Sequence, residues 1–166
     1  RLRSASGHYP ATSALIALAE AVRTIVGEGS AITYAADWTE YGAHVLEGGR
    51  EVRFPLDPLW ASPAIDAVGI DFSPPLSDWR DGTGHGDAAE ARSIYDRDYL
   101  RSRLTAGEAY DWYYASEEDR IAQRRSPITD GAYGKPWLFR QKDLAGWWAN
   151  EHIERVDGVE TGPTAW

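Results

Sequence analysis

The stretch that most constrains the fold runs from Val68 to Gly82, because it changes from apolar and extended to polar and aromatic within a few residues. Its first part, Val68–Phe72, is typical of a strand that is buried on both faces in a parallel sheet. Pro74 and Pro75 must end this strand, since proline has no N–H to donate to the ladder. The loop that follows holds Asp78, Trp79, Arg80 and Asp81. In parallel α/β folds such loops carry the chemistry, so it is a candidate functional segment; the alternative is an ordinary solvated loop.

A second stretch repeats this order of elements earlier in the chain. Residues Tyr9–Ile25 predict a helix with Pro10 in its first turn. Its expected core-facing side chains recur at helical spacing: Leu15, Leu18, Ala19, Val22 and Ile25. The strand Ile32–Ala36 follows, and it ends in Asp37, Trp38, Thr39, Glu40 and Tyr41. Two strands that each release carboxylates and aromatic residues indicate a parallel α/β sheet or barrel.

The remaining elements are less clearly marked. Glu51–Phe54 alternates weakly and is expected to be a short edge strand. Asp96–Tyr114 predicts a helix that Gly107 weakens, and Ser116 is the expected N-cap of another helix that reaches Arg125. The segment from Asp157 to the end reads as loop.

Composition excludes several classes of protein. The 166 residues are 43% apolar and suffice for one globular domain, and no apolar run approaches the roughly 18 residues that a membrane helix needs. A net charge of -9 argues against nucleic acid and anionic membrane surfaces as main partners. The chain lacks cysteine, and with it disulfides and thiolate metal sites. It also lacks methionine, even at position 1, so we expect a piece of a longer chain.

No metal or cofactor site is expected. Gly82, Gly84 and Gly86 surround His85, but no second ligand lies at a suitable spacing from this histidine. The glycines are not followed by the Lys-Ser/Thr pair of a phosphate-binding loop.

The aromatic residues and carboxylates suggest a glycan cleft. Eight Trp and nine Tyr are many for this length, and aromatic faces stack on sugars while carboxylates bond their hydroxyl groups. Glycoside hydrolysis needs two carboxyl groups, and Glu40 and Asp71 could face each other from the ends of two strands. The alternative is that the aromatic residues fill the core and that the loop carboxylates are solvated.

Several longer motifs carry a resemblance to a known family. They are Thr33–Tyr41, Leu56–Trp60, Gly69–Asp71, Pro75–Gly82, Tyr110–Tyr114, Ile128–Trp137 and Lys142–Leu144. Together they resemble the TIM-barrel-like domain of the large gene-transfer-agent and phage tail protein, also described as the host-specificity or baseplate protein. The resemblance runs over nearly the whole chain.

The resemblance implies an α/β fold, a partial (β/α)8 TIM barrel similar to glycoside hydrolases. In it Ile32–Ala36 would be strand five and Val68–Phe72 strand six, with flanking helices, and residues 1–166 would be a fragment of one domain. The family's two candidate catalytic glutamates would lie on strand four, before Arg1, and on strand seven, after Trp166. No catalytic residue is therefore expected within the chain, which is expected to be inactive alone. The Asn-Tyr pair that commonly follows strand six is replaced here by Phe72-Ser73.

The expected substrate-binding residues are Asp37, Trp38, Glu40, Asp71, Asp78 and Trp79, clustered at the carboxyl ends of the two strands. A competing interpretation makes the loop after Pro75 a rigid corner in which Arg80 pairs with Asp78 or Asp81.

Two functions follow from the resemblance. One is a glycosidase-like enzyme in the tail or baseplate of a phage-like particle, assembled in the bacterial cytoplasm and acting on cell-envelope glycan. The other is a non-catalytic scaffold or receptor-binding module. The expected partners are an envelope saccharide and other tail proteins, without nucleic acid or membrane insertion.

Overall fold

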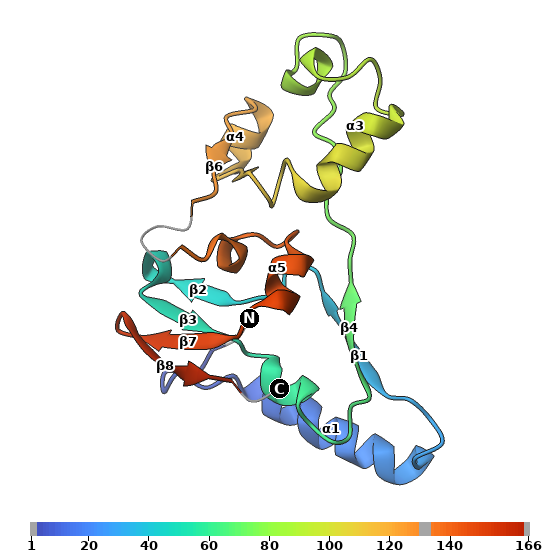
Figure 1. Ribbon diagram of the computed structural model, residues 1–166, viewed down its shortest axis with the longest axis vertical. Coiled ribbons are helices and arrows are strands. Elements are labelled where there is room, and N and C mark those ends of the chain that lie inside the picture. The colour runs from blue at the N-terminus through green and yellow to red at the C-terminus, as the bar shows by residue number, and fades with distance from the viewer. Residues whose placement is uncertain (1–2, 130–133, 165–166) are drawn as a thin grey trace. The chain divides into compact units, whose positions relative to one another are not determined.

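The computed structural model describes residues 3–129 and 134–164. Within them the chain divides into two compact units (Figure 1). Unit 1 consists of residues 1–72 and 149–166, and unit 2 consists of residues 73–148. Unit 2 is thus an insertion that begins directly after the second predicted strand. Small sheets and helices make up a mixed α/β structure, and no sheet of the described residues closes into a barrel.

The two predicted parallel strands are confirmed in unit 1. Strand β1 (Thr33–Asp37) pairs with β4 (Ala67–Asp71) in parallel, as Figure 1 shows. Their expected burial on both faces is wrong, because only Ala36 of the ten residues is buried. At Gly69 the two backbones approach so closely that a Cβ would lie 2.7 Å from the carbonyl oxygen of Tyr34. Glycine is therefore required at this position for steric reasons.

Helix α1 (Pro10–Val26) is confirmed, but its predicted core face is only partly right. Ala19 is buried, and Leu15 and Val22 are half-buried. Leu18 and Ile25, which we expected to be buried, are 59% and 84% exposed. The helical period identified the apolar side chains, whereas the face that packs depends on the neighbouring elements.

The rest of unit 1 is a four-stranded antiparallel sheet in the order β2-β3-β7-β8. It contains β2 (His44–Leu46), β3 (Glu51–Arg53), β7 (Ile153–Val156) and β8 (Val159–Pro163). The short helices η1 (Glu47–Gly49) and α2 (Asp57–Trp60) complete the unit.

Two predictions for this sheet were wrong. Strand β3 lies between β2 and β7 and is not an edge strand. The expected C-terminal loop is the hairpin β7–β8, whose turn is formed by Asp157 and Gly158, both at positive φ. An Asp-Gly pair in this conformation is typical of a two-residue hairpin turn.

The core of unit 1 contains a buried polar pair beside its apolar side chains. Phe54 stacks on the His152 ring, with centroids 4.3 Å apart, and His152 Nδ1 lies 2.8 Å from Asp57 Oδ2. Trp60 is also buried in this core. This pair ties the segment before β7 to helix α2, although the two are far apart in sequence.

Unit 2 is built from short elements. In chain order these are η2 (Gly86–Ala89), α3 (Arg97–Ser102), η3 (Arg103–Thr105), β5 (Trp112–Tyr113), α4 (Glu117–Ile121), β6 (Ser126–Pro127), η4 (Pro136–Phe139) and the start of α5 (Leu144–Ala149). Strands β5 and β6 pair in antiparallel orientation.

The predicted helix over Asp96–Tyr114 is wrong beyond Ser102. Gly107 and Ala109 adopt positive φ values of 79° and 65°, which no α-helix accommodates. The chain therefore turns into β5 instead of continuing the helix. Ser116 is confirmed as the N-cap of α4, since its Oγ accepts a hydrogen bond from the amide of Asp119 at 3.2 Å.

Candidate functional site

The carboxyl ends of β1 and β4 bring two predicted site residues together. Asp37 and Asp71 are register partners in the parallel pair. Register partners project to the same face, so both carboxylates stand on the face that also carries Thr33, Ala35 and Ala67. All five are exposed, whereas Tyr34 and Ala36 on the opposite face are covered. The two strands thus place a pair of carboxylates on an exposed face that otherwise carries small side chains.

The loop after β1 holds Asp37 in a fixed orientation. Its Oδ1 accepts hydrogen bonds from the amide of Thr39 at 2.8 Å and from the Thr39 hydroxyl. These bonds from the Thr39 side chain and backbone hold the pKa of Asp37 below its ordinary value, because they favour the charged form. The Trp38 amide donates to the carbonyl of Asp71 at 3.0 Å, which joins this loop to the end of β4. Asp37, Trp38 and Asp71 therefore lie together at the ends of β1 and β4.

Glu40 is engaged elsewhere in unit 1. The Tyr34 hydroxyl donates to Glu40 Oε2 at 3.1 Å, and Tyr34 comes from the opposite face of β1 to Asp37. Burial, and then the charge of Glu40, raise the pKa of Tyr34. Glu40 also lines a cavity of about 40 Å³ together with the start of α1 and the segment Pro55–Leu56. The structure thus places the Glu40 carboxylate with Tyr34 and α1.

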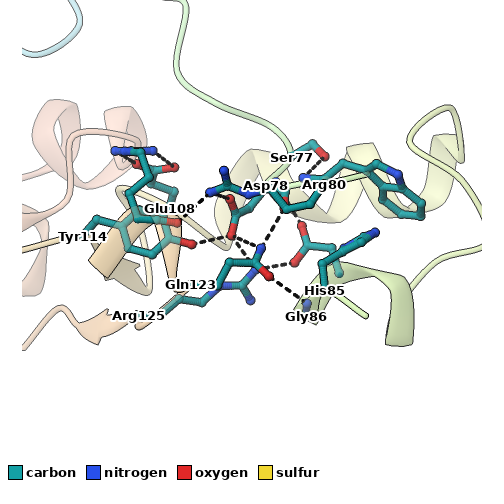
Figure 2. Close-up of polar contacts among 12 residues, drawn as sticks. Ser77, Asp78, Arg80, His85, Gly86, Glu108, Tyr114, Gln123 and Arg125 are labelled. Atoms are coloured by element: carbon teal, nitrogen blue, oxygen red, sulfur yellow. Dashed lines mark hydrogen bonds and ion pairs between the residues drawn. The ribbon is translucent and has the colours of Figure 1, made fainter. Parts of the chain in front are cut away.

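Asp78, in unit 2, is the centre of a buried polar network (Figure 2). Its Oδ1 accepts a hydrogen bond from Arg80 at 2.8 Å. Its Oδ2 accepts hydrogen bonds from Gln123 and Arg125, both at 2.9 Å, and a further one from the Tyr114 hydroxyl. Burial by itself would raise the pKa of Asp78, but the hydrogen bonds outweigh it and lower the pKa. Both oxygens are occupied by protein donors.

A second buried carboxylate, Asp87, shares Arg125 with Asp78. Arg125 donates to Asp87 Oδ1 at 2.6 Å, and Asp87 Oδ2 accepts from the Asp78 amide at 3.0 Å and from the Tyr99 hydroxyl. Burial by itself would lower the pKa of Arg125, but its hydrogen bonds to the two aspartates outweigh this effect and raise its pKa. The network fastens the loop Ser77–Asp87 to α3, to Tyr114 and to the segment after α4. The Asp78–Arg80 ion pair that the rigid-corner interpretation predicted is present.

Trp79 belongs to the same loop and is half-buried. Its ring meets His85 edge to face, with centroids 4.5 Å apart, and Tyr99 at 6.2 Å. His85 Nδ1 accepts a hydrogen bond from the Ala88 amide at 3.1 Å. Among residues 3–129 and 134–164, no group of three or more possible ligands gathers around a metal site.

The sequence interpretation missed most of the Asp78 network. Gln123, Arg125, Tyr99 and Tyr114 lie 21 to 47 positions from Asp78, and no spacing pattern links them to it. One available signal was the double proline before Asp78. Prolines cannot donate backbone hydrogen bonds, so the loop after them must be held by other contacts, such as those of side chains. Arginine-aromatic stacks among the described residues of unit 2 were also missed; in one, Arg125 lies 4.3 Å from the centre of the Trp112 ring.

Comparison with known proteins gives the family. The model of the gene transfer agent (GTA) TIM-barrel-like domain matches residues 1–166, the whole chain. The chain belongs to this family. A comparison with curated proteins found no match. The resemblance seen in the sequence is thereby confirmed, and the GTA domain points to a gene-transfer-agent particle as its setting. No helix in the described part of the GTA domain is long and apolar enough to cross a membrane.

Proposed function

We propose that the GTA domain contributes two neighbouring strands, β1 and β4, to a glycoside-hydrolase-like (β/α)8 barrel, and that their carboxyl ends bind cell-envelope glycan. In this proposal the protein acts in the tail or baseplate of the particle, where it contacts the envelope during delivery. Other tail proteins would be its structural neighbours.

The in-register Asp37–Asp71 pair carries this proposal. In parallel α/β enzymes, residues at the carboxyl ends of strands face the substrate. Here two carboxylates stand side by side on an exposed face and Trp38 lies in the adjoining loop. Carboxylates accept hydrogen bonds from sugar hydroxyls, and an indole offers an apolar face to the ring. The small side chains that precede the carboxylates on the same face leave room for a sugar.

The other predicted residues would have supporting roles. Glu40 would be held by Tyr34 at the edge of the site. Because both Asp78 oxygens already accept protein donors, Asp78 would act by fixing the loop that bears Trp79.

The second candidate function is a non-catalytic scaffold. The Asp78–Asp87–Arg125 network favours it, since buried carboxylates that already accept hydrogen bonds from protein donors rigidify a structure without binding anything else. On this view the loop after Pro75 is a structural corner and the domain only positions other tail proteins.

Cosedimentation with purified peptidoglycan sacculi separates the two functions. We expect the Asp37→Asn and Asp71→Asn variants to weaken retention of the chain at least fivefold, and Glu20→Gln, an exposed carboxylate on α1, to leave it unchanged. Equal retention of all four proteins, or no retention of any, would favour the scaffold.

A further inference from the structure

Two Asp-Gly pairs of the described chain share the same covalent chemistry but are held very differently. One is Asp157–Gly158, which forms the turn of the β7–β8 hairpin, and the other is Asp81–Gly82, in the loop after Trp79. A third pair, Asp130–Gly131, lies outside the described residues. An aspartate that precedes glycine is prone to rearrange, because glycine has no Cβ to hinder the approach of its nitrogen to the aspartate side chain.

The rearrangement needs no reagent other than water. The glycine nitrogen attacks the Cγ atom of the protonated aspartate, and the carboxyl hydroxyl leaves with the amide proton as water, so that a succinimide ring forms. Water then opens the ring at one of its two carbonyl groups. Opening at Cγ restores aspartate, whereas opening at the former backbone carbonyl gives isoaspartate, in which the main chain runs through Cγ and the α-carboxylate is free. The product has the mass of the starting chain and one more carbon atom in its backbone.

The hairpin holds Asp157–Gly158 away from this reaction. The Gly158 amide donates to the carbonyl of Arg50 at 2.8 Å, and the Gly158 carbonyl accepts a hydrogen bond from Arg155. Val156 and Val159 are register partners on the two sides of the turn. These bonds must break before the Gly158 nitrogen can turn toward Cγ, so the folded hairpin opposes ring formation.

Asp81–Gly82 lies in a part of the chain that is open to water. All residues from 81 to 84 are exposed, and Gly82 and Gly84 have open space around them. Gly82 has a positive φ of 83°, which a residue with a Cβ rarely adopts. Within residues 3–129 and 134–164, no hydrogen bond engages the Gly82 amide or the Asp81 carboxylate. The nitrogen and the carboxyl group can therefore approach each other without breaking a contact.

We propose that Asp81 is the position at which the folded chain isomerises to isoaspartate, while the β7–β8 hairpin protects Asp157. Arg80 and His85 flank the open residues and are both fixed (Figure 2). Arg80 donates to Asp78 Oδ1, and His85 is buried. The added backbone carbon is taken up between these two points, so the Asp78 network is retained. The free α-carboxylate stands on an exposed loop, where a protein isoaspartyl methyltransferase can reach it and transfer a methyl group from S-adenosylmethionine.

Peptide mapping of the 166-residue chain, aged at neutral pH below its melting temperature, tests the proposal. Tryptic cleavage after Arg92 and Arg155 places the two pairs on separate peptides, and electron-transfer fragmentation locates the isoaspartate. In the folded chain we expect isoaspartate to accumulate at position 81 at least about fivefold faster than at position 157, because local opening of the hairpin limits the second rate. In concentrated urea the two rates should agree within about twofold, since both pairs then lose their folded contacts. Asp81→Glu is the control and should remove the signal at position 81, because glutamate forms the larger ring far more slowly.

Three results would overturn the proposal. They are equal or faster accumulation at position 157 in the folded chain, no isoaspartate at position 81 when the urea-treated chain forms it, and a fivefold ratio that persists in urea. The last result would assign the difference to the neighbouring sequence instead of the fold. Circular dichroism of the aged sample shows that the chain stays folded during the incubation.

Discussion

Arg125 should be the side chain on which the stability of unit 2 depends most. Its guanidinium bridges two carboxylates whose side chains are only 5% and 4% exposed, those of Asp78 and Asp87. It also stacks on Trp112 at 4.3 Å. Replacing Arg125 by Gln removes the shared cation and leaves both buried aspartates with fewer partners.

The contacts that remain set the size of the effect. Removing one partner of a buried ion pair costs about 3–5 kcal/mol. Asp78 would keep Arg80, Tyr114 and Gln123, whereas Asp87 would keep, among the described residues, the Tyr99 hydroxyl and the Asp78 amide. Because Asp78 retains one cation, we expect the lower end of the range, about 3 kcal/mol.

Hydrogen exchange at the Asp78 amide gives a local measure of this loss. This amide donates to Asp87 Oδ2, so its protection reports the opening of the network. Arg124→Gln is the matched control, because Arg124 forms its ion pair with Asp119 at 63% exposure and such pairs contribute about 0–1 kcal/mol. If Arg125→Gln lowered the opening free energy by no more than Arg124→Gln does, the network would not hold the loop.

Two further predictions concern other parts of the chain. Burial lowers the pKa of Lys142 to about 8 from its ordinary 10.5, so the unfolded chain binds more protons than the folded chain between these two pH values. The free energy of unfolding should therefore rise between pH 8 and about pH 10, by up to about 3 kcal/mol. In urea titrations the Lys142→Met variant should lose this pH dependence, and an unchanged pH dependence would refute the assignment. Gly69→Ala should lower the free energy of unfolding by at least about 2 kcal/mol, because the added Cβ would clash with Thr33 Oγ1 and the Tyr34 carbonyl. Gly42→Ala is the control: Gly42 has open space around it, so this change should cost less than about 1 kcal/mol. Equal costs would contradict the close approach of β1 and β4.

The elements with strong local patterns could be predicted from the sequence. Helix α1 and strands β1 and β4 were found because a helical period and short apolar runs are local signals. The exposure of Leu18 and Ile25 could not be found in this way, because it depends on what packs against α1. The hairpin β7–β8 was missed although its Asp-Gly turn signal was present, since Val159–Pro163 contains Gly162 and little apolar character.

The candidate site followed the same division. The adjacency of Asp37 and Asp71 was predictable, because parallel neighbours place their carboxyl ends side by side. The hydrogen bond between Tyr34 and Glu40 was not predictable, because the two side chains meet only in the folded chain. The same holds for the hydrogen bonds that other side chains donate to both Asp78 oxygens. The grouping of all six predicted residues around one ligand stays a prediction.

The most direct test of the proposed function is an NMR titration of the chain with the peptidoglycan disaccharide. The account predicts saturable shifts of the amides of Trp38, Thr39 and Glu40, which surround the Asp37–Asp71 pair, and their loss in Asp71→Asn. Shifts that persist in Asp71→Asn, or that avoid residues 37–40 altogether, would contradict it.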